Sequence, residues 1–277
     1  MNKSILLALF FCSSHLALAS PASPPLSARE IMQKNEQARQ INELKTEAKI
    51  SSGTENPGGK TTEEKVKDFT FWRKLQKDGI HNSTLTRFHA PAEVKEEGIL
   101  IVENSTGRND VLLYLPNFKK IRRVESQQQS GSFMGSVFSY SDIASPHVDD
   151  YQYTILKEEK CPTTEPTQNM CTIVESTPAN DDVKERTQYS RSVLWIRQDN
   201  FMMAKSEYFD LTGTLFKKLE ASETVIADPK NKKWISKRIH VLNTKTHEYT
   251  TLEFSNIQVN SGISDSLFTQ QNLQKVN

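Results

Sequence analysis

The sequence lacks a long apolar run in its body and lacks an excess of charge of one sign. Beyond the N-terminal segment, no stretch approaches the ~18 consecutive apolar residues that a membrane-spanning helix requires, so we expect no membrane span. Lysine and arginine total 35 against 34 acidic residues. Because nucleic-acid-binding proteins normally carry a strong basic excess, nucleic acid is not expected as a partner.

The common motifs of enzymes, nucleotide sites and metal sites are also missing. The ten glycines form neither GxGxxG nor GxxxxGK, and the Gly-rich stretch 131–135 has Phe133 where a GxSxG elbow needs its serine. The six histidines include no HExxH pair and no cluster with Cys, Asp or Glu at ligand spacing. The sequence therefore predicts no catalytic residues, no cofactor and no metal.

Cysteine is scarce, with three residues in the whole chain. Only Cys161 and Cys171 lie outside the N-terminal segment, and in an exported protein such a pair most simply forms a disulfide. The alternative is a redox-active pair, which the absence of a CxxC motif and the loop-like surroundings disfavour.

The N-terminal segment has the features of an export signal. Lys3 precedes an apolar run, and Ala17-Leu18-Ala19 provides a small-residue cleavage site before Ser20. We predict a signal peptide at residues 1–19 that is cleaved near Ala19, a proline-rich tether at 20–26 and a single domain at 27–277. The mature protein is expected in the periplasm, and loss of Lys3 makes its formal net charge zero.

One long helix is predicted at the start of the domain. Ser27 and Glu30 form a capping box, and apolar side chains recur at helical spacing at Ile31, Ala38, Ile41, Leu44 and Ala48. This pattern predicts a helix from Ala28 to about Ile50. Its apolar stripe is thin, which suits a helix that lies across the face of a sheet.

From Val66 onward the pattern is that of strands. Short runs of alternating character, such as Gly98 to Glu103 and Asp110 to Leu115, follow one another at intervals typical of antiparallel sheets. Asp181 and Asp182 lie in an expected polar connection. About eleven strands and one helix predict a curved antiparallel sheet with a helical lid, because large twisted sheets tend to curl.

The stretch from Leu115 to Ile143 combines a proline, a basic cluster and a glycine-punctuated apolar segment. Such a combination is poor material for a core strand and predicts a gate, lid or rim. The basic residues either contact anionic head groups or an acidic partner, or protect a sheet edge from pairing. The apolar residues around Phe133 either contact a ligand or close one end of the core. The basic cluster consists of Lys119, Lys120, Arg122 and Arg123.

Within this stretch, LYLPNFKKIRRV (113–124) and SGSFMGSVFSYSDI (130–143) resemble the signature of the outer membrane lipoprotein-sorting proteins, a branch of the LolA-like superfamily. Further similarity lies in AREIMQKN (28–35), EYFDLTGTLFKKLE (207–220) and SNIQVNSGISDSLFTQQNL (255–273). The resemblance implies a mainly β fold with an α lid, in which an unclosed, curved antiparallel β-barrel of about eleven strands is covered by helices.

The resemblance also implies a function. In the superfamily, the apolar cavity holds the acyl chains of lipids or lipoproteins during transfer across the periplasm. We therefore expect a periplasmic carrier or chaperone that is a monomer. The branch is associated with exporters of the resistance-nodulation-division (RND) type. The alternative is an accessory or sensor subunit that docks onto such an exporter, or onto a signalling protein, without carrying cargo.

The predicted acyl-binding residues are apolar members of successive strands together with apolar side chains of the 115–143 stretch. The alternation leaves open which face of each strand points into the cavity. The candidates are Leu100, Val102, Leu113, Leu115, Phe133, Met134, Phe138, Val193, Trp195, Ile239, Val241, Leu252 and Phe254.

Overall fold

The computed structural model describes residues 25–56, 61–62, 64–104, 108–144, 146–162 and 169–275. The predicted signal peptide and most of the predicted tether lie outside these residues, as does most of the loop between the two cysteines. The described residues form thirteen strands, whereas about eleven were predicted. The four α-helices are α1 (Ala28–Arg39), α2 (Tyr140–Ile143), α3 (Asp181–Thr187) and α4 (Gln270–Leu273).

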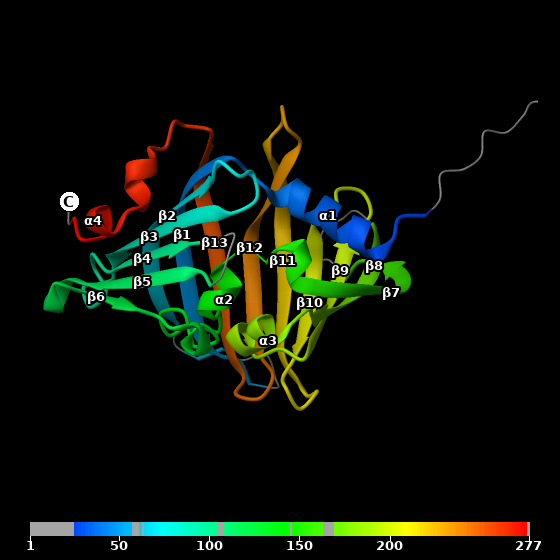
Figure 1. Cartoon of the computed structure of the whole chain (residues 1–277). Helices are drawn as coiled ribbons and strands as arrows, with labels where there is room; N and C mark the ends of the chain where they lie inside the picture. The colour runs from blue at the N-terminus through cyan, green and yellow to red at the C-terminus, as the bar shows by residue number, and fades with distance from the viewer. Residues whose placement is uncertain are drawn as a thin grey trace, which may run out of the picture.

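The strands form one antiparallel sheet, whose order is β6-β5-β4-β3-β2-β1-β13-β12-β11-β10-β9-β8-β7. Strands that follow one another in the chain are neighbours in the sheet, except β6 and β7, and the first strand also pairs with the last. The sheet curves, and β6 and β7 form its two edges without pairing with each other (Figure 1). The prediction of a curved, unclosed antiparallel sheet is therefore confirmed. The strands are β1 (Glu43–Thr54), β2 (Lys65–Leu75), β3 (Asn82–Ala90), β4 (Gly98–Val102), β5 (Asp110–Leu115), β6 (Lys120–Arg123), β7 (Tyr151–Lys160), β8 (Met170–Pro178), β9 (Arg191–Arg197), β10 (Met203–Phe209), β11 (Leu215–Asp228), β12 (Lys233–Asn243) and β13 (Glu248–Val259).

The predicted long helix is wrong beyond Arg39. The helix ends there because Gln40 is extended, and β1 begins three residues later. Leu44 and Ala48 are four residues apart, so their spacing fits a helix and equally fits one face of a strand. The strand forms because both of its edges find partners, β2 on one side and β13 on the other.

Other differences from the prediction are local. The short edge strand β6 was not expected in the 115–143 stretch, whose composition is poor material for a core strand. The predicted polar connection at Asp181 and Asp182 is instead the start of α3. That helix forms because the Asn180 side chain accepts a hydrogen bond from the backbone N–H of Val183 and so caps the first turn.

The helix α1 lies across the concave face of the sheet, in contact with β7 and β12 (Figure 1). It begins with the predicted capping box of Ser27 and Glu30. Its buried face packs Ile31 and Met32 against Leu194 and other apolar side chains of the sheet. The position agrees with the prediction made from its thin apolar stripe.

A second cover for the concave face follows from the topology. The strands β6 and β7 are consecutive in the chain but form opposite edges of the sheet, so residues 124–150 must run from one edge to the other. This crossing segment, named here by those bounds, contains α2 and two 3-10 turns, at Ser126–Gln128 and Val148–Asp150. Most of its apolar side chains pack in the main core cluster of the sheet, and Val148 packs with α1.

The opposite face of the sheet carries two smaller apolar clusters. One joins β3, β4 and β5 to Leu273 of α4, and the other joins β8, β9 and β10 near the cysteine pair. Cys161 and Cys171 form the predicted disulfide, with a Cα–Cα distance of 5.0 Å. These clusters leave the concave face as the place where a ligand would be enclosed.

Candidate functional site

A cavity of about 330 Å³ lies between the concave face of the sheet, α1 and the crossing segment. That volume falls within the range of small-molecule sites in proteins, roughly 300–1,000 Å³. Most of its wall is aliphatic and aromatic. The apolar lining includes Met32, Ile41, Leu44, Ile50, Phe69, Phe71, Phe133, Phe138, Leu194, Ile196, Leu219, Ala221, Ile235, Ile239, Leu252 and Phe254.

Strand alternation explains which side chains reach the cavity. Phe69 and Phe71 of β2 are two residues apart and share the concave face, as do Leu252 and Phe254 of β13. The two strands flank β1, and the rings of Phe71 and Phe254 lie 6.0 Å apart between their centroids. Apolar residues of the same parity thus form a continuous wall.

The crossing segment contributes Phe133 and Phe138 to the cavity. The backbone N–H of Ser136 donates to the carbonyl oxygen of Phe133 at 3.0 Å, and Met134 and Gly135 between them both have positive φ. Such a two-residue turn needs glycine or another tolerant residue, which accounts for the glycine-punctuated sequence. The ammonium of Lys67 donates to the Met134 carbonyl oxygen at 2.8 Å and ties the turn to β2.

Of the thirteen predicted acyl-binding residues, Phe133, Phe138, Ile239, Leu252 and Phe254 line the cavity. Three more, Leu113, Met134 and Val241, pack in the main core cluster on the concave side without lining it. Contact of any of these residues with a ligand stays a prediction.

The remaining candidates lie elsewhere. Leu100 and Val102 pack in the cluster beneath α4, and Val193 and Trp195 pack in the cluster near the disulfide. Leu115 is half-buried at the end of β5. In β9 both parities are apolar, so the sequence had no signal that Leu194 and Ile196, rather than their neighbours, face the cavity.

The basic cluster lies at the β6 edge of the sheet. Lys119, Lys120, Arg122 and Arg123 are all exposed, and Arg123 pairs with Asp110 of the neighbouring strand. The position suits both sequence-based interpretations, contact with a partner or protection of the edge.

A buried polar triad connects the crossing segment to the sheet. The ammonium of Lys217 lies 2.7 Å from Oδ2 of Asp142 and 2.8 Å from the hydroxyl of Tyr189, which donates to Oδ1 of Asp142 at 2.6 Å. Burial alone would raise the pKa of Asp142, but the charge and hydrogen bond of Lys217 outweigh it and lower that pKa. The same burial, together with the Asp142 charge, raises the pKa of Tyr189. The carboxylate is therefore ionised and holds α2 against β11.

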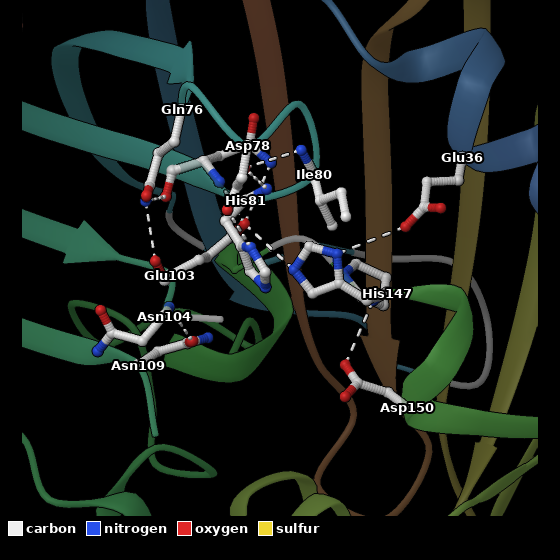
Figure 2. Close-up of polar contacts among 12 residues, drawn as sticks. Glu36, Gln76, Asp78, Ile80, His81, Glu103, Asn104, Asn109, His147 and Asp150 are labelled. Carbon is white, nitrogen blue, oxygen red and sulfur yellow. Dashed lines mark hydrogen bonds and ion pairs between the residues drawn. The ribbon is translucent and has the colours of Figure 1, made fainter. Parts of the chain in front are cut away.

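A second polar group lies where α1, the end of β4 and the crossing segment meet. His147 is placed with Nδ1 3.4 Å from Glu36 of α1 and Nε2 3.2 Å from Glu103, which follows β4 (Figure 2). Burial lowers the pKa of His147, but the interactions with the carboxylates of Glu103 and Glu36 outweigh it and raise that pKa to about 9. We refer to Glu36, Glu103 and His147 as the histidine clamp, since they join three parts of the chain.

The surroundings of the clamp are also paired. The backbone N–H of His147 donates to Asp150 at 3.3 Å, and Asp150 in turn lies 2.7 Å from the guanidinium of Arg186. The ring of His81, which contacts Asp78 at 2.7 Å, lies 4.9 Å from the His147 ring between centroids. Two further cations, Arg39 and Arg73, line the cavity beside the clamp.

The sequence did not predict the polar triad or the histidine clamp, because the members of each are distant in the chain. Within the described ranges, no three His, Cys, Asp or Glu side chains are arranged to hold a metal ion. Nor does any helix of that part combine the length and apolar character needed to cross a membrane.

Comparison with known proteins gives the following matches. A family model described as "Uncharacterized protein" matches residues 81–275. No curated protein matches the chain. Among solved structures, an outer membrane lipoprotein-sorting protein domain from Vibrio parahaemolyticus is 23% identical over 90% of this chain and 98% of its own length, with a TM-score of 0.79.

Two further structures are similar. A DUF1329 family protein from Desulfovibrio piger is 28% identical over 89% of this chain and 97% of its own, with a TM-score of 0.78. A LolA superfamily protein from Nitrosomonas europaea is 20% identical over 90% of this chain and 100% of its own, with a TM-score of 0.66. The resemblance stated from the sequence is confirmed by these neighbours.

Proposed function

Since the chain belongs to the family matched over residues 81–275 and shares its fold with lipoprotein-sorting and LolA superfamily proteins, we propose that it is a carrier that shields an acyl chain. The cargo would be a lipid or a lipoprotein, held during passage through the periplasm toward the outer membrane. The disulfide supports an oxidising compartment of this kind. We propose that the protein acts as a monomer, without catalytic residues or a cofactor, and that an RND-type exporter is one of its partners.

The observation that carries this proposal is the enclosed apolar cavity. An acyl chain in water is unfavourable, and each methylene that moves into an apolar site contributes about 0.8 kcal/mol. The cavity meets this need because aliphatic and aromatic side chains from β1, β2, β11, β12 and β13 face α1 and the crossing segment across it. The fixed sheet would form the wall, and the covering segments would open to admit the chain.

Filling the cavity is expected to abolish acyl binding. Ala221 lines the cavity on β11, and a tryptophan there would occupy the space of the ligand. We expect Ala221→Trp to lower the amount of lipid that co-purifies with detergent-free protein by about tenfold or more. A loss of about 1.4 kcal/mol of binding free energy is enough for a tenfold change in affinity. Native mass spectrometry followed by lipid extraction measures the bound fraction.

The matched control is Glu220→Trp, at the preceding, exposed position of β11. Its side chain points away from the cavity, so bound lipid should equal that of the wild type. Equal lipid content in all three proteins would contradict the position of the site. Absence of co-purifying lipid, together with no uptake of an acyl probe by the wild type, would remove the support for a carrier.

A second candidate function is docking onto a membrane exporter or signalling protein without cargo. The observation that favours it is an exposed aromatic beside the basic cluster. Phe118 is 69% exposed and directly precedes Lys119, and aromatic and cationic side chains are enriched at sites that meet membranes or partners.

Charge reversal of the basic cluster separates the two functions. The change replaces Lys119, Lys120, Arg122 and Arg123 by glutamate, and all four are exposed, so folding should be preserved. Loss of partner capture with unchanged acyl uptake is expected if the cluster docks. Loss of uptake with unchanged capture would assign the cluster to cargo handling instead.

A further inference from the structure

Arg73 is a cation in a mostly apolar wall. It lies on β2 with the parity of Phe69 and Phe71, and all three side chains line the cavity. Its guanidinium carbon lies 5.2 Å from the centroid of the Phe71 ring. Nε of Arg73 is fully buried and has no hydrogen-bond partner among the residues that the structure describes. Buried polar groups are nearly always hydrogen-bonded, so this donor indicates a partner supplied by a ligand.

The guanidinium keeps its charge in this position. Burial lowers the pKa of Arg73 to about 10, the Glu103 charge raises it and the nearby Arg39 lowers it. The value is still well above neutral pH. A charged donor that faces an apolar cavity selects ligands with a complementary anion.

Charged groups of both signs lie around Arg73. Both carboxylates of the histidine clamp, Glu36 and Glu103, already face His147 at 3.4 and 3.2 Å. Arg39 donates from Nη2 to the carbonyl oxygen of Pro146 at 2.6 Å, and the charges of Glu36 and Glu103 stabilise its protonated form. The two carboxylates are therefore shared among Arg39, Arg73 and His147, and Nε of Arg73 is left without a partner among the described residues.

We propose that the cavity binds amphiphiles with an anionic head group, a carboxylate or a phosphate, whose head pairs with Arg73 while the tail fills the apolar wall. The inference rests on the proposed function, because it assigns the head group of a ligand whose tail the cavity encloses. Arginine suits both head groups, since its planar fork donates two parallel hydrogen bonds to a carboxylate or a phosphate. Arg39 lies at the same end and adds to the attraction.

The test compares three probes of one chain length with delipidated mature protein: dodecanoate, dodecyl phosphate and dodecanol. The anionic probes should bind about ten- to hundredfold more tightly than dodecanol, the range expected for a hydrogen bond to a charged group. In Arg73→Gln this preference should disappear, with the affinity for dodecanol unchanged. Arg73→Lys should keep part of it. Inorganic phosphate alone should not bind, because the tail contributes most of the affinity.

The control variant is Arg238→Gln, which removes a half-buried arginine that pairs with Glu253 and does not line the cavity. It should leave the preference unchanged. Equal binding of the three probes by the wild type, or a preference that survives Arg73→Gln, would overturn the inference while the carrier function stands. Failure of every probe to bind would instead contradict the carrier function. Tight binding of inorganic phosphate alone would contradict the proposal that the ligand is an amphiphile and would indicate a site for a free anion.

Thermal unfolding checks that Arg73→Gln remains folded. The variant removes a buried charge, so its unfolding midpoint without ligand should not fall below that of the wild type. If it falls strongly, Arg39→Gln provides the second variant, because Arg39 is half-buried at the end of α1 and lines the same cavity. It should reduce the preference for the anionic probes, and an unchanged preference would count against the inference.

Discussion

Replacing Lys217 by methionine is expected to lower the free energy of unfolding by about 3–5 kcal/mol, the cost of leaving one partner of a buried ion pair alone. Lys217 is 5% exposed and lies within hydrogen-bond distance of both Asp142 and Tyr189. Without the ammonium, the carboxylate of Asp142 keeps only neutral donors in a buried site. Urea unfolding followed by circular dichroism measures the loss.

The pH dependence identifies the carboxylate as the cause. In the wild type the pKa of Asp142 lies below its ordinary value of 3.8, so the ionised group stabilises the fold above that pH and loses this contribution as the pH falls. The variant lacks the cation that lowers this pKa. The stability difference between wild type and Lys217→Met should therefore shrink in acid.

Two companion variants test the explanation. Lys218→Met removes a lysine from the next position of β11, on the other face of the sheet, and should change stability by no more than about 0.5 kcal/mol. The double variant Lys217→Met with Asp142→Asn removes both charges and should recover part of the loss. A double variant no more stable than Lys217→Met, or a control as damaging as the test, would contradict the assignment.

Replacing His147 by leucine is expected to lower the free energy of unfolding by about 2–3 kcal/mol. The loss is smaller than for a fully buried ion pair because the clamp is partly open to solvent. Glu103 is 1% exposed, and it would keep the hydrogen bonds from Asn82 but lose the imidazolium. Glu36 on α1 would lose the same partner. We therefore expect the loss to appear in thermal unfolding and as increased hydrogen exchange in α1.

The histidine clamp also predicts a loss of stability at alkaline pH. The pKa of folded His147 is about 9, above the ordinary value of 6.5. Protonation therefore stabilises the fold fully below pH 6.5, and the contribution is lost as the pH rises through about 9. In unfolding experiments across this window, the difference between wild type and His147→Gln should decrease. Two curves that remain parallel would exclude His147 as the titrating group.

The sequence predicted the architecture well because strand period and turn residues are local signals. It did not predict β1, since Leu44 and Ala48 satisfy a helical spacing as well as a strand. The decision depends on pairing with β2 and with β13. The sequence near residue 44 carries no information about pairing with β13, which lies at the other end of the domain.

The site was predicted only in part, for a similar reason. Phe133 and Phe138 could be predicted because the turn between them has a distinctive sequence. Lys217 and Asp142, in contrast, come into contact only in the folded chain. The sequence does contain a signal for a buried cation in β2. Arg73 shares the parity of Phe69 and Phe71, and a charged residue on the apolar side of a strand indicates a buried cation.

Pairing of β1 with β13 has a consequence for the order in which the protein can be completed. The register joins Leu44 to Val259 and Thr54 to Glu248, so the first strand to leave the ribosome pairs with the last. Until the C-terminal strand is present, β1 has an open edge, and edges of this kind pair readily with other chains. Long-range pairing of this extent also slows folding. We therefore expect chains truncated before β13 to aggregate rather than to form a smaller sheet.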